Sequence, residues 1–311
     1  MTALRPFRFG VIAYDVQSKE EWISKAKRIE QLGYSILLVP DHFWRQLAPV
    51  PAILLAAEAT QSIRVGSYVF DNDFRHPVTL AMEAATLDVL TVGRFELGIG
   101  AGYLRSEYEQ AGLSYDPANV RVSRLEEAIK VMKGLFAEDS LAFAGKYYTV
   151  NNLDCFPKPV QRPHPPLLVG GGGKRLLTLA AREASIVSIV PKTLSDGSGL
   201  DVMDMTSEAT SQKVEWIRDA AGERFDQLEL NTIISEVIVT ENRHQISLQL
   251  AESFQTTAER VLSIPHCLIG TIDQMCEALQ RRREQFGISY ISIFDEHREA
   301  FAPVVTRLAG T

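Results

Sequence analysis

The feature that most constrains the fold of this chain is a regular alternation between short apolar runs and longer segments with helical periodicity. Runs such as ILLV at 36–39 are almost continuously apolar, which is typical of strands buried on both faces of a parallel sheet. The segments between the runs place apolar residues three or four positions apart, as one face of a helix requires. The sequence therefore predicts repeated β-α units that build a parallel sheet.

The alternation continues until eight strands can be counted. Strands are expected at 8–13, 35–39, 63–70, 95–100, 167–173, 185–190, 228–239 and 290–294. Helices are expected at 18–32, 52–60, 77–91, 120–136, 174–183, 207–221, 247–261 and 271–286. Because the count reaches eight and a helix follows nearly every strand, a closed (β/α)8 TIM barrel is favoured over an open doubly wound sheet.

We expect one α/β domain over residues 1–311, since a single barrel core can accommodate a chain of 311 residues. Two stretches interrupt the alternation with Gly, Pro, aromatic or polar residues. They predict inserted loops at about 139–165, including a hairpin, and at about 191–205.

Composition argues against several partners. The net charge is −7 and Lys and Arg do not cluster, so no nucleic-acid partner is expected. No apolar run approaches the roughly 18 residues of a membrane helix, and the first residues lack the features of a signal peptide. No membrane partner and a cytoplasmic location are therefore expected. Cys155, Cys267 and Cys276 are widely spaced without a nearby His pair, so neither disulfides nor a metal site are expected.

In a barrel of this kind the active site lies where the strands end at their carboxyl termini. PDHFWR follows the second expected strand and supplies Asp41, His42 and Trp44. An imidazole exchanges a proton near neutral pH, and aromatic faces can cover a flat ring system. We predict that these residues belong to a hydride-transfer site. The alternative is that Asp41 caps the next segment and His42 is structural.

Four glycines, Gly170, Gly171, Gly172 and Gly173, lead directly into a helix that begins at Lys174. Unobstructed backbone N–H groups at a helix N-terminus can bind a phosphate, and Lys174 adds formal charge. The sequence predicts a phosphate site here. A tight turn that uses the glycines only for its geometry is the alternative.

The run Gly98-Ile99-Gly100-Ala101-Gly102 follows the fourth strand, but the rest of a dinucleotide-binding fingerprint is missing. We expect Gly100, Ala101 and Gly102 to let the backbone approach a bound cofactor closely, with packing alone as the alternative. Arg121 and Arg124 lie on the long helix at 120–136, where a solvated ion-pair face is the default expectation.

Taken together, LLVPDHFW, NDFRHPVTLAMEAATLDVLTVGRFELGIGAGY, GKYY and LLVGGGGKRLLTLAA resemble the luciferase-like superfamily of flavin and deazaflavin oxidoreductases. Their order most resembles the branch that uses coenzyme F420. The resemblance implies a TIM-like barrel, usually a homodimer. It also implies that the cofactor ring rests on a backbone bulge at Ser67, Tyr68 and Val69, near Asn72. The phosphate is then expected against the glycine run at 170–173.

In the same family His42 and Trp44 would face the reacting carbon, with Asp41 orienting the histidine. Relatives that oxidise a sugar phosphate carry a carboxylate just after the glycine run of the fourth strand, where this chain has Tyr103. A phenol has an ordinary pKa of about 10 and is no substitute for a carboxylate base, although it can donate a proton or a hydrogen bond.

The resemblance therefore implies a reductase that moves a hydride from reduced F420 to a C=C or C=N bond of a small organic substrate, or the reverse dehydrogenation. One alternative is an FMN-dependent monooxygenase that uses reduced flavin and oxygen. Another is a flavin-binding protein without catalytic activity.

Overall fold

The computed structural model of the chain describes residues 4–137, 139–253 and 256–311. Eight parallel strands form a closed barrel: β1 (Arg8–Ile12), β2 (Ile36–Val39), β3 (Arg64–Ser67), β5 (Phe95–Gly100), β8 (Leu167–Gly171), β9 (Ile186–Ile189), β10 (Glu229–Ile234) and β13 (Ile288–Phe294). The order is β3-β2-β1-β13-β10-β9-β8-β5, and β5 pairs again with β3 through Val65 and Phe95. The expected TIM barrel is confirmed.

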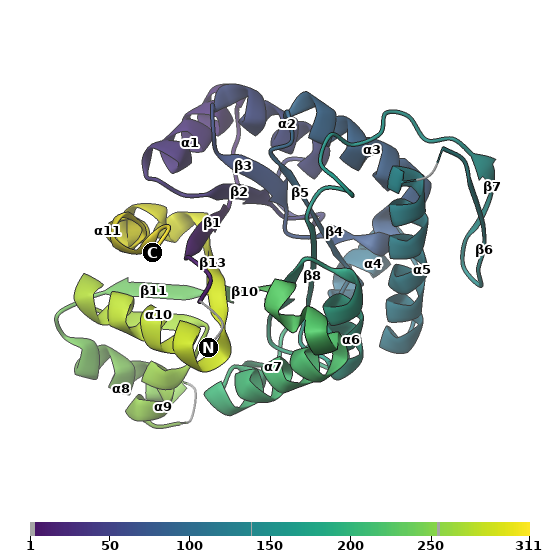
Figure 1. Cartoon of the computed structure of the whole chain (residues 1–311). Helices are drawn as coiled ribbons and strands as arrows, with labels where there is room; N and C mark the ends of the chain where they lie inside the picture. The colour runs from purple at the N-terminus through teal and green to yellow at the C-terminus, as the bar shows by residue number, and fades with distance from the viewer. Residues whose placement is uncertain (1–3, 138, 254–255) are drawn as a thin grey trace.

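Helices surround the strands on all sides (Figure 1). They are α1 (Lys19–Gln31), α2 (Pro49–Ala59), α3 (Pro77–Leu90), α4 (Arg105–Ala111), α5 (Ala118–Ala137), α6 (Lys174–Glu183), α7 (Ser207–Ala221), α8 (Arg243–Ser253), α9 (Ala258–Ser263), α10 (Ile272–Phe286) and α11 (Arg298–Leu308). Local signals set their ends. Ser18 accepts the N–H of Glu21 at the start of α1, Thr271 forms a capping box on α10, and Gly287 ends α10 with a φ of 75°.

The structure corrects several expected boundaries. The strand expected at 63–70 is divided into β3 and a short β4 (Phe70–Asp71), with a cis peptide between Tyr68 and Val69. The strand expected at 228–239 leaves the barrel at Ser235, whose N–H binds the His266 carbonyl. Its second half is β11 (Glu236–Val239), which pairs with β12 (Cys267–Gly270) outside the barrel.

The helix expected at 247–261 is two helices, α8 and α9, and its residues 254–255 lie outside the described part of the chain, as do residues 1–3 and 138 of the expected domain. The first insertion contains the expected hairpin, formed by β6 (Leu141–Ala144) and β7 (Thr149–Leu153), which projects beyond α5 (Figure 1). The second insertion carries a single turn of 3-10 helix at Val202–Asp204.

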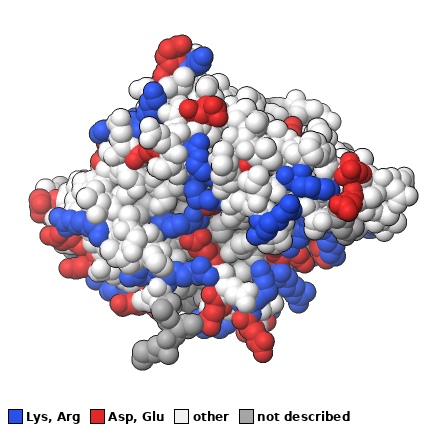
Figure 2. Space-filling view, turned by 45° about the horizontal axis from the view of Figure 1, so that its top comes forward, with Lys and Arg blue, Asp and Glu red and all other residues white. Residues whose placement is uncertain are grey.

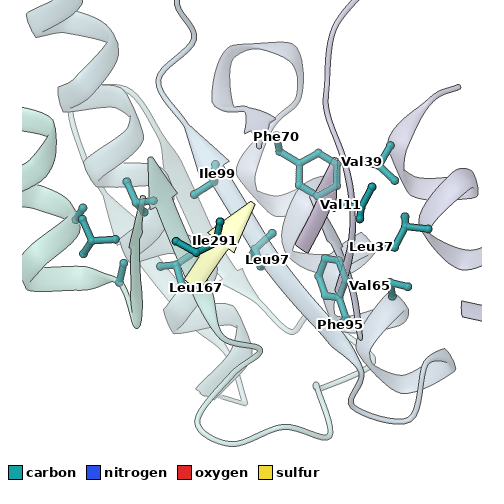
Figure 3. Close-up of a cluster of buried hydrophobic side chains, with 14 of the residues drawn as sticks. Val11, Leu37, Val39, Val65, Phe70, Phe95, Leu97, Ile99, Leu167 and Ile291 are labelled. Carbon is teal, nitrogen blue, oxygen red and sulfur yellow. The ribbon is translucent and has the colours of Figure 1, made fainter. Parts of the chain in front are cut away.

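Alternate strand residues build two separate apolar layers. Figure 3 shows the layer between strands and helices, with Val11, Leu37, Val65, Phe95 and Leu97 among its members. A smaller cluster fills the barrel interior and consists of Ile12, Ile36, Leu38, Leu168, Ile186 and Tyr290. Since both faces of the strands are buried, the barrel is a rigid support for the loops at its carboxyl ends.

The described helices include none that is both long enough and apolar enough to cross a membrane. On the face drawn in Figure 2, Lys and Arg side chains are interspersed with Asp and Glu.

Candidate active site

Three aromatic side chains meet at the carboxyl end of the barrel. His42 and Trp44 follow β2, and Tyr103 follows β5. The ring centroids of His42 and Trp44 are 4.0 Å apart, and the Tyr103 ring stands edge-on to His42 at 5.8 Å. The Trp44 loop is fixed by Gln46, which accepts the indole N–H and donates to the Pro40 carbonyl. The side chain of His42 is 15% exposed, so the ring is largely shielded but reachable.

Glu107 on α4 holds the imidazole in place. Its Oε2 lies 2.8 Å from Nδ1 of His42, and its Oε1 accepts the backbone N–H of Phe43 at 2.8 Å. Glu107 is buried. Nδ1 is therefore engaged by Glu107. Nε2 is the ring nitrogen that remains for a ligand at the barrel mouth, the open carboxyl end of the barrel.

Asp41 does not orient His42, and that expectation is wrong. The Asp41 carboxylate binds the guanidinium of Arg75 at 2.5 and 3.2 Å and accepts the N–H of Asp71 at 3.0 Å. Successive side chains of an extended segment point to opposite sides, so Asp41 and His42 face different neighbours. Asp41 ties the loop after β2 to the segment after β4 instead.

A cluster of buried carboxylates lies next to the contacts of Asp41 with Arg75 and Asp71. The hydroxyl of Tyr108, the residue after Glu107, lies 2.9 Å from both oxygens of Asp71 and 3.3 Å from one oxygen of Asp73. Burial raises the pKa of Asp71 to about 7, against the lowering effect of the Asp73 N–H and the Tyr108 hydroxyl. Burial and the two carboxylates likewise raise the pKa of Tyr108.

The residues expected beneath the cofactor ring have polar partners of their own. Ser67 exchanges hydrogen bonds with the backbone of Gly98, so its hydroxyl is already engaged within the protein. The Tyr68 hydroxyl contacts Ser188 at 2.5 Å inside the barrel, and burial raises the pKa of this phenol to about 12.

Val69 packs against the apolar cluster that fills the barrel interior, at the break between β3 and β4. Asn72 is buried, and its amide donates to Tyr148 of the first insertion at 3.2 Å and to Asp73 at 3.3 Å.

Packing of protein against protein accounts for the glycines after β5. A Cβ on Gly100 would meet Val69 at 2.8 Å, and one on Gly102 would meet the Tyr108 hydroxyl at 1.9 Å. The carbonyls of Ala101 and Gly102 accept hydrogen bonds from Arg121 at 3.0 and 3.3 Å. A close approach of a cofactor to this segment stays a prediction.

Arg121 is thus not on a solvated ion-pair face, as the sequence had suggested. It is buried, because its guanidinium crosses from α5 to four backbone or hydroxyl oxygens around the β5 loop. Arg124 is partly buried and pairs with Asp73 and Asp116 at 2.8 and 2.7 Å. Arg121 therefore holds the loop that carries Tyr103, whereas Arg124 joins α5 to Asp73 and Asp116.

The glycine run at 170–173 begins inside β8 and contains both crowded and open positions. A Cβ on Gly171 would meet the Leu176 side chain at 2.5 Å, and one on Gly172 would meet the backbone of Pro191 at 2.5 Å. Gly173 has open space around its Cβ position and stands at the N-terminus of α6, which no side chain caps. A Cβ on Gly170 would contact only Ser188, at 3.4 Å.

The ammonium group of Lys174 lies 5.9 Å from the ring centroid of Trp216, where Lys192 also lies, at 5.7 Å. Room for an anion at the start of α6 therefore exists at Gly173, with the side chains of two lysines nearby.

The insertion at 191–205 is attached to α4. The N–H of Arg105 donates to the Gly197 carbonyl at 2.9 Å, and its Nε donates to the Asp196 carbonyl at 2.6 Å. Between these segments lies a pocket of about 360 Å³, lined by Arg105, Tyr115, Asp116, Pro117, Ala118, Arg121, Thr193, Leu194 and Ser195. His42 does not line this pocket. The pocket nevertheless adjoins the barrel mouth, because Tyr115 in its wall donates its hydroxyl to the Tyr103 carbonyl at 2.9 Å.

The segments that follow the third and fourth expected strands contain Asp71, Asp73, Glu107 and Tyr108. The contact of Glu107 with His42 and the contacts of Tyr108 with the two aspartates were not predicted from the sequence. Position alone could have identified Glu107, since it lies in GAGYLRSEY, directly after a barrel strand. Among the described residues, no group of three or more His, Cys, Asp or Glu side chains is arranged to hold a metal ion.

Comparisons with known proteins agree with this architecture. An F420-dependent glucose-6-phosphate dehydrogenase of Amycolatopsis mediterranei is 32% identical over 161 residues, which are 48% of this chain and 47% of that protein. An FMNH(2)-dependent dimethylsulfone monooxygenase of Pseudomonas putida is 31% identical over 124 residues, 40% of this chain and 34% of that protein. The chain spans about half the length, or less, of such curated relatives.

The similarity in fold extends over the whole chain. A solved F420-dependent secondary alcohol dehydrogenase, in complex with an F420-acetone adduct, superposes with a TM-score of 0.76. The match covers 97% of this chain and 99% of that one, at 18% identity. The model of the family described as luciferase-like monooxygenase matches residues 4–200. With nearly two thirds of its length matched, the chain belongs to the luciferase-like monooxygenase family.

Proposed function

We propose that this protein is an F420-dependent oxidoreductase that transfers a hydride from reduced F420 to a C=C or C=N bond of a small organic substrate. The reverse dehydrogenation is the nearest variant. The observation that carries the proposal is the contact between His42 and the buried Glu107 at the carboxyl end of the barrel, with the Trp44 ring tilted against the imidazole at 4.0 Å between centroids. Several relatives of this chain have names that begin with F420-dependent, which supports the choice of cofactor.

The residues present fit a phosphate-bearing cofactor. Gly173 leaves open space at the uncapped N-terminus of α6, where backbone N–H groups point toward an anion. The phosphate would be held there, with Lys174 and Lys192 adding positive charge. The ring would rest against Tyr68, Val69 and Asn72, with the β5 loop at 100–102 close to it. When bound, the reduced deazaflavin supplies the hydride.

The side chains of this protein would supply orientation and the proton. Glu107 fixes the His42 ring, so that Nε2 faces the mouth and can give a proton to the substrate atom next to the one that receives the hydride. In the reverse direction Nε2 would accept the proton from the amine nitrogen or the carbon next to the carbon that gives up the hydride. Tyr103, whose pKa is raised by burial and by Glu107, stays protonated and can donate a hydrogen bond. Trp44 covers the imidazole and limits the access of water.

A second candidate is an FMN-dependent monooxygenase. The similarity to the dimethylsulfone monooxygenase of Pseudomonas putida favours it. A flavin-binding protein without catalysis is a third, and it would lose nothing but local packing on His42→Ala.

Fluorescence-quench titration of the purified protein with F420 and with FMN, at matched ionic strength, tests the choice of cofactor. Tight binding of F420 with weak binding of FMN supports the proposal. Preference for FMN, together with oxygen consumption on addition of reduced FMN, would put the monooxygenase first. Turnover that survives His42→Ala would refute the assignment of His42.

We also propose that the chain is one domain, acts in the cytoplasm and assembles as a homodimer. The helix α3 supports a dimer, because its apolar residues are not confined to one face: Met82 and Leu90 are 48% and 49% exposed, close to Val92 at 84%. A helix that is apolar all round normally has a partner on each side.

A further inference from the structure

We propose that Glu107 is a positioning residue that fixes which nitrogen of His42 carries the proton. In this arrangement Nδ1 is protonated and faces Glu107, and Nε2 is presented to the barrel mouth. The consequence for catalysis rests on the proposed function. The tautomer itself does not, since it is a property of the protein without cofactor or substrate.

The argument begins with the donors around one carboxylate. The two oxygens of Glu107 each have one partner at 2.8 Å, the backbone N–H of Phe43 and Nδ1 of His42. A backbone N–H can only donate. An ionised carboxylate can only accept, so Nδ1 must carry a proton for its contact to be a hydrogen bond. A neutral His42 is then left with an unprotonated Nε2.

The surroundings keep this carboxylate in place. The side chain of Glu107 is 8% exposed, so water does not compete for its oxygens. The next residue, Tyr108, contacts Asp71 and Asp73, which anchors α4 from the other side. Arg121 binds the carbonyls just before the helix. Glu107 therefore reaches His42 from an element that is itself held at several points.

A fixed tautomer is useful to a proton-transfer residue. Neutral His42 can accept a proton only at Nε2, and doubly protonated His42 can donate one from Nε2. The same nitrogen thus serves both directions of the reaction. A purely structural role for Glu107 would need only one hydrogen bond and no particular tautomer.

Substitution of Glu107 by Gln separates these roles. The amide oxygen can still accept from Phe43, but the NH₂ group then points at Nδ1, where two donors would face each other. His42 can avoid this clash only by moving its proton to Nε2. Glu107→Gln is therefore expected to reverse the tautomer, whereas Glu107→Asp keeps a carboxylate and is expected to keep the original one.

The first measurement is the ¹⁵N–¹H two-bond correlation spectrum of the histidine rings in the protein without cofactor, at a pH where His42 is neutral. His42→Gln identifies its signals among the six histidines. The wild type should show the Nδ1–H form and Glu107→Gln the Nε2–H form. Glu109→Gln is the matched control, because Glu109 is an exposed carboxylate on the same helix, and it should leave the His42 signals unchanged.

A second readout is modification by diethyl pyrocarbonate, which attacks an unprotonated ring nitrogen, followed by peptide mapping. Modification of His42 should slow by about ten-fold or more in Glu107→Gln, because Nε2 is then protonated. The Nδ1–H tautomer would bring two buried donors together, which disfavours it by at least that ratio. Affinity for F420 should stay within about two-fold, since neither residue contacts the phosphate site.

An Nε2–H form in the wild type would overturn the proposal, even if Glu107→Gln failed to fold. An unchanged tautomer and modification rate in a folded Glu107→Gln variant would do the same. Failure of the wild type to bind F420 or FMN would refute the proposed function instead, and would leave the tautomer result standing.

Discussion

The buried carboxyl of Asp71 makes a quantitative prediction about pH and stability. Its pKa is raised from 3.8 to about 7 in the folded protein, chiefly by burial. Between these values the folded chain holds a proton that the unfolded chain has released, so the free energy of unfolding falls as pH rises through this window. One pKa unit corresponds to about 1.4 kcal/mol, so the loss between about pH 5 and pH 8 is about 3 kcal/mol.

Asp71→Asn removes this titration while it keeps most of the local contacts. The amide oxygen can accept the Asp73 N–H, and the NH₂ group can donate to the Tyr108 hydroxyl, which donates to Asp73 in turn. Near pH 5 the variant should unfold at nearly the same urea concentration as the wild type. Near pH 8 it should be more stable than the wild type by about 3 kcal/mol.

Urea unfolding followed by circular dichroism at several pH values tests this difference directly. Titrating groups distant from Asp71 contribute equally to both proteins, so they cancel in the comparison. A difference between variant and wild type that is the same at pH 5 and pH 8 would refute the reasoning, because it would mean that Asp71 does not titrate between them.

Three further predictions concern the phosphate site, the barrel and the dimer. Gly172→Ala should lower both stability and F420 affinity, because its Cβ meets the Pro191 backbone. Gly173→Ala should leave the stability unchanged, since its Cβ has open space, and melting curves of both variants test this difference. Glu96→Gln should cost about 1.5–3 kcal/mol in urea unfolding, since it removes the charge of a buried carboxylate that two partly buried arginines share. A loss below about 0.5 kcal/mol would contradict this. Leu90→Asp should convert a dimer to monomers in sedimentation velocity without a change in circular dichroism.

Much of the barrel could be predicted because its signals are local. The bounds expected for β5, α6 and α7 are those observed, and each of these elements has a marked start or end, such as Gly173 before α6 and the Thr206 cap on α7. The helix α4 was not expected, since its seven residues contain too few apolar positions to show a period. The departure of β11 from the barrel depends on its pairing with β12, which is a long-range contact.

The site was predictable in its location and not in its internal contacts. The carboxyl ends of the strands pointed to His42 and Trp44, the resemblance to the family pointed to Tyr103, and these three rings do lie together. The partner of His42 could not be found among its neighbours in sequence, because Glu107 is 65 positions away. Burial of Arg121 was missed for a similar reason: two of its four acceptors belong to the β5 loop, about 20 positions back along the chain.

The hydrogen bonds from Arg105 to the carbonyls of Asp196 and Gly197 have a consequence for protein engineering. The insertion at 191–205 is an obvious target for exchange with the loop of a relative in order to change substrate preference. Because it is fastened to α4, which also carries Glu107, a graft that lacks these two carbonyl positions would disturb the histidine on the opposite side of the barrel. Under the proposed function, a change in this loop would alter both the substrate pocket and the placement of Glu107, so loop libraries should keep the backbone at 196–197 constant.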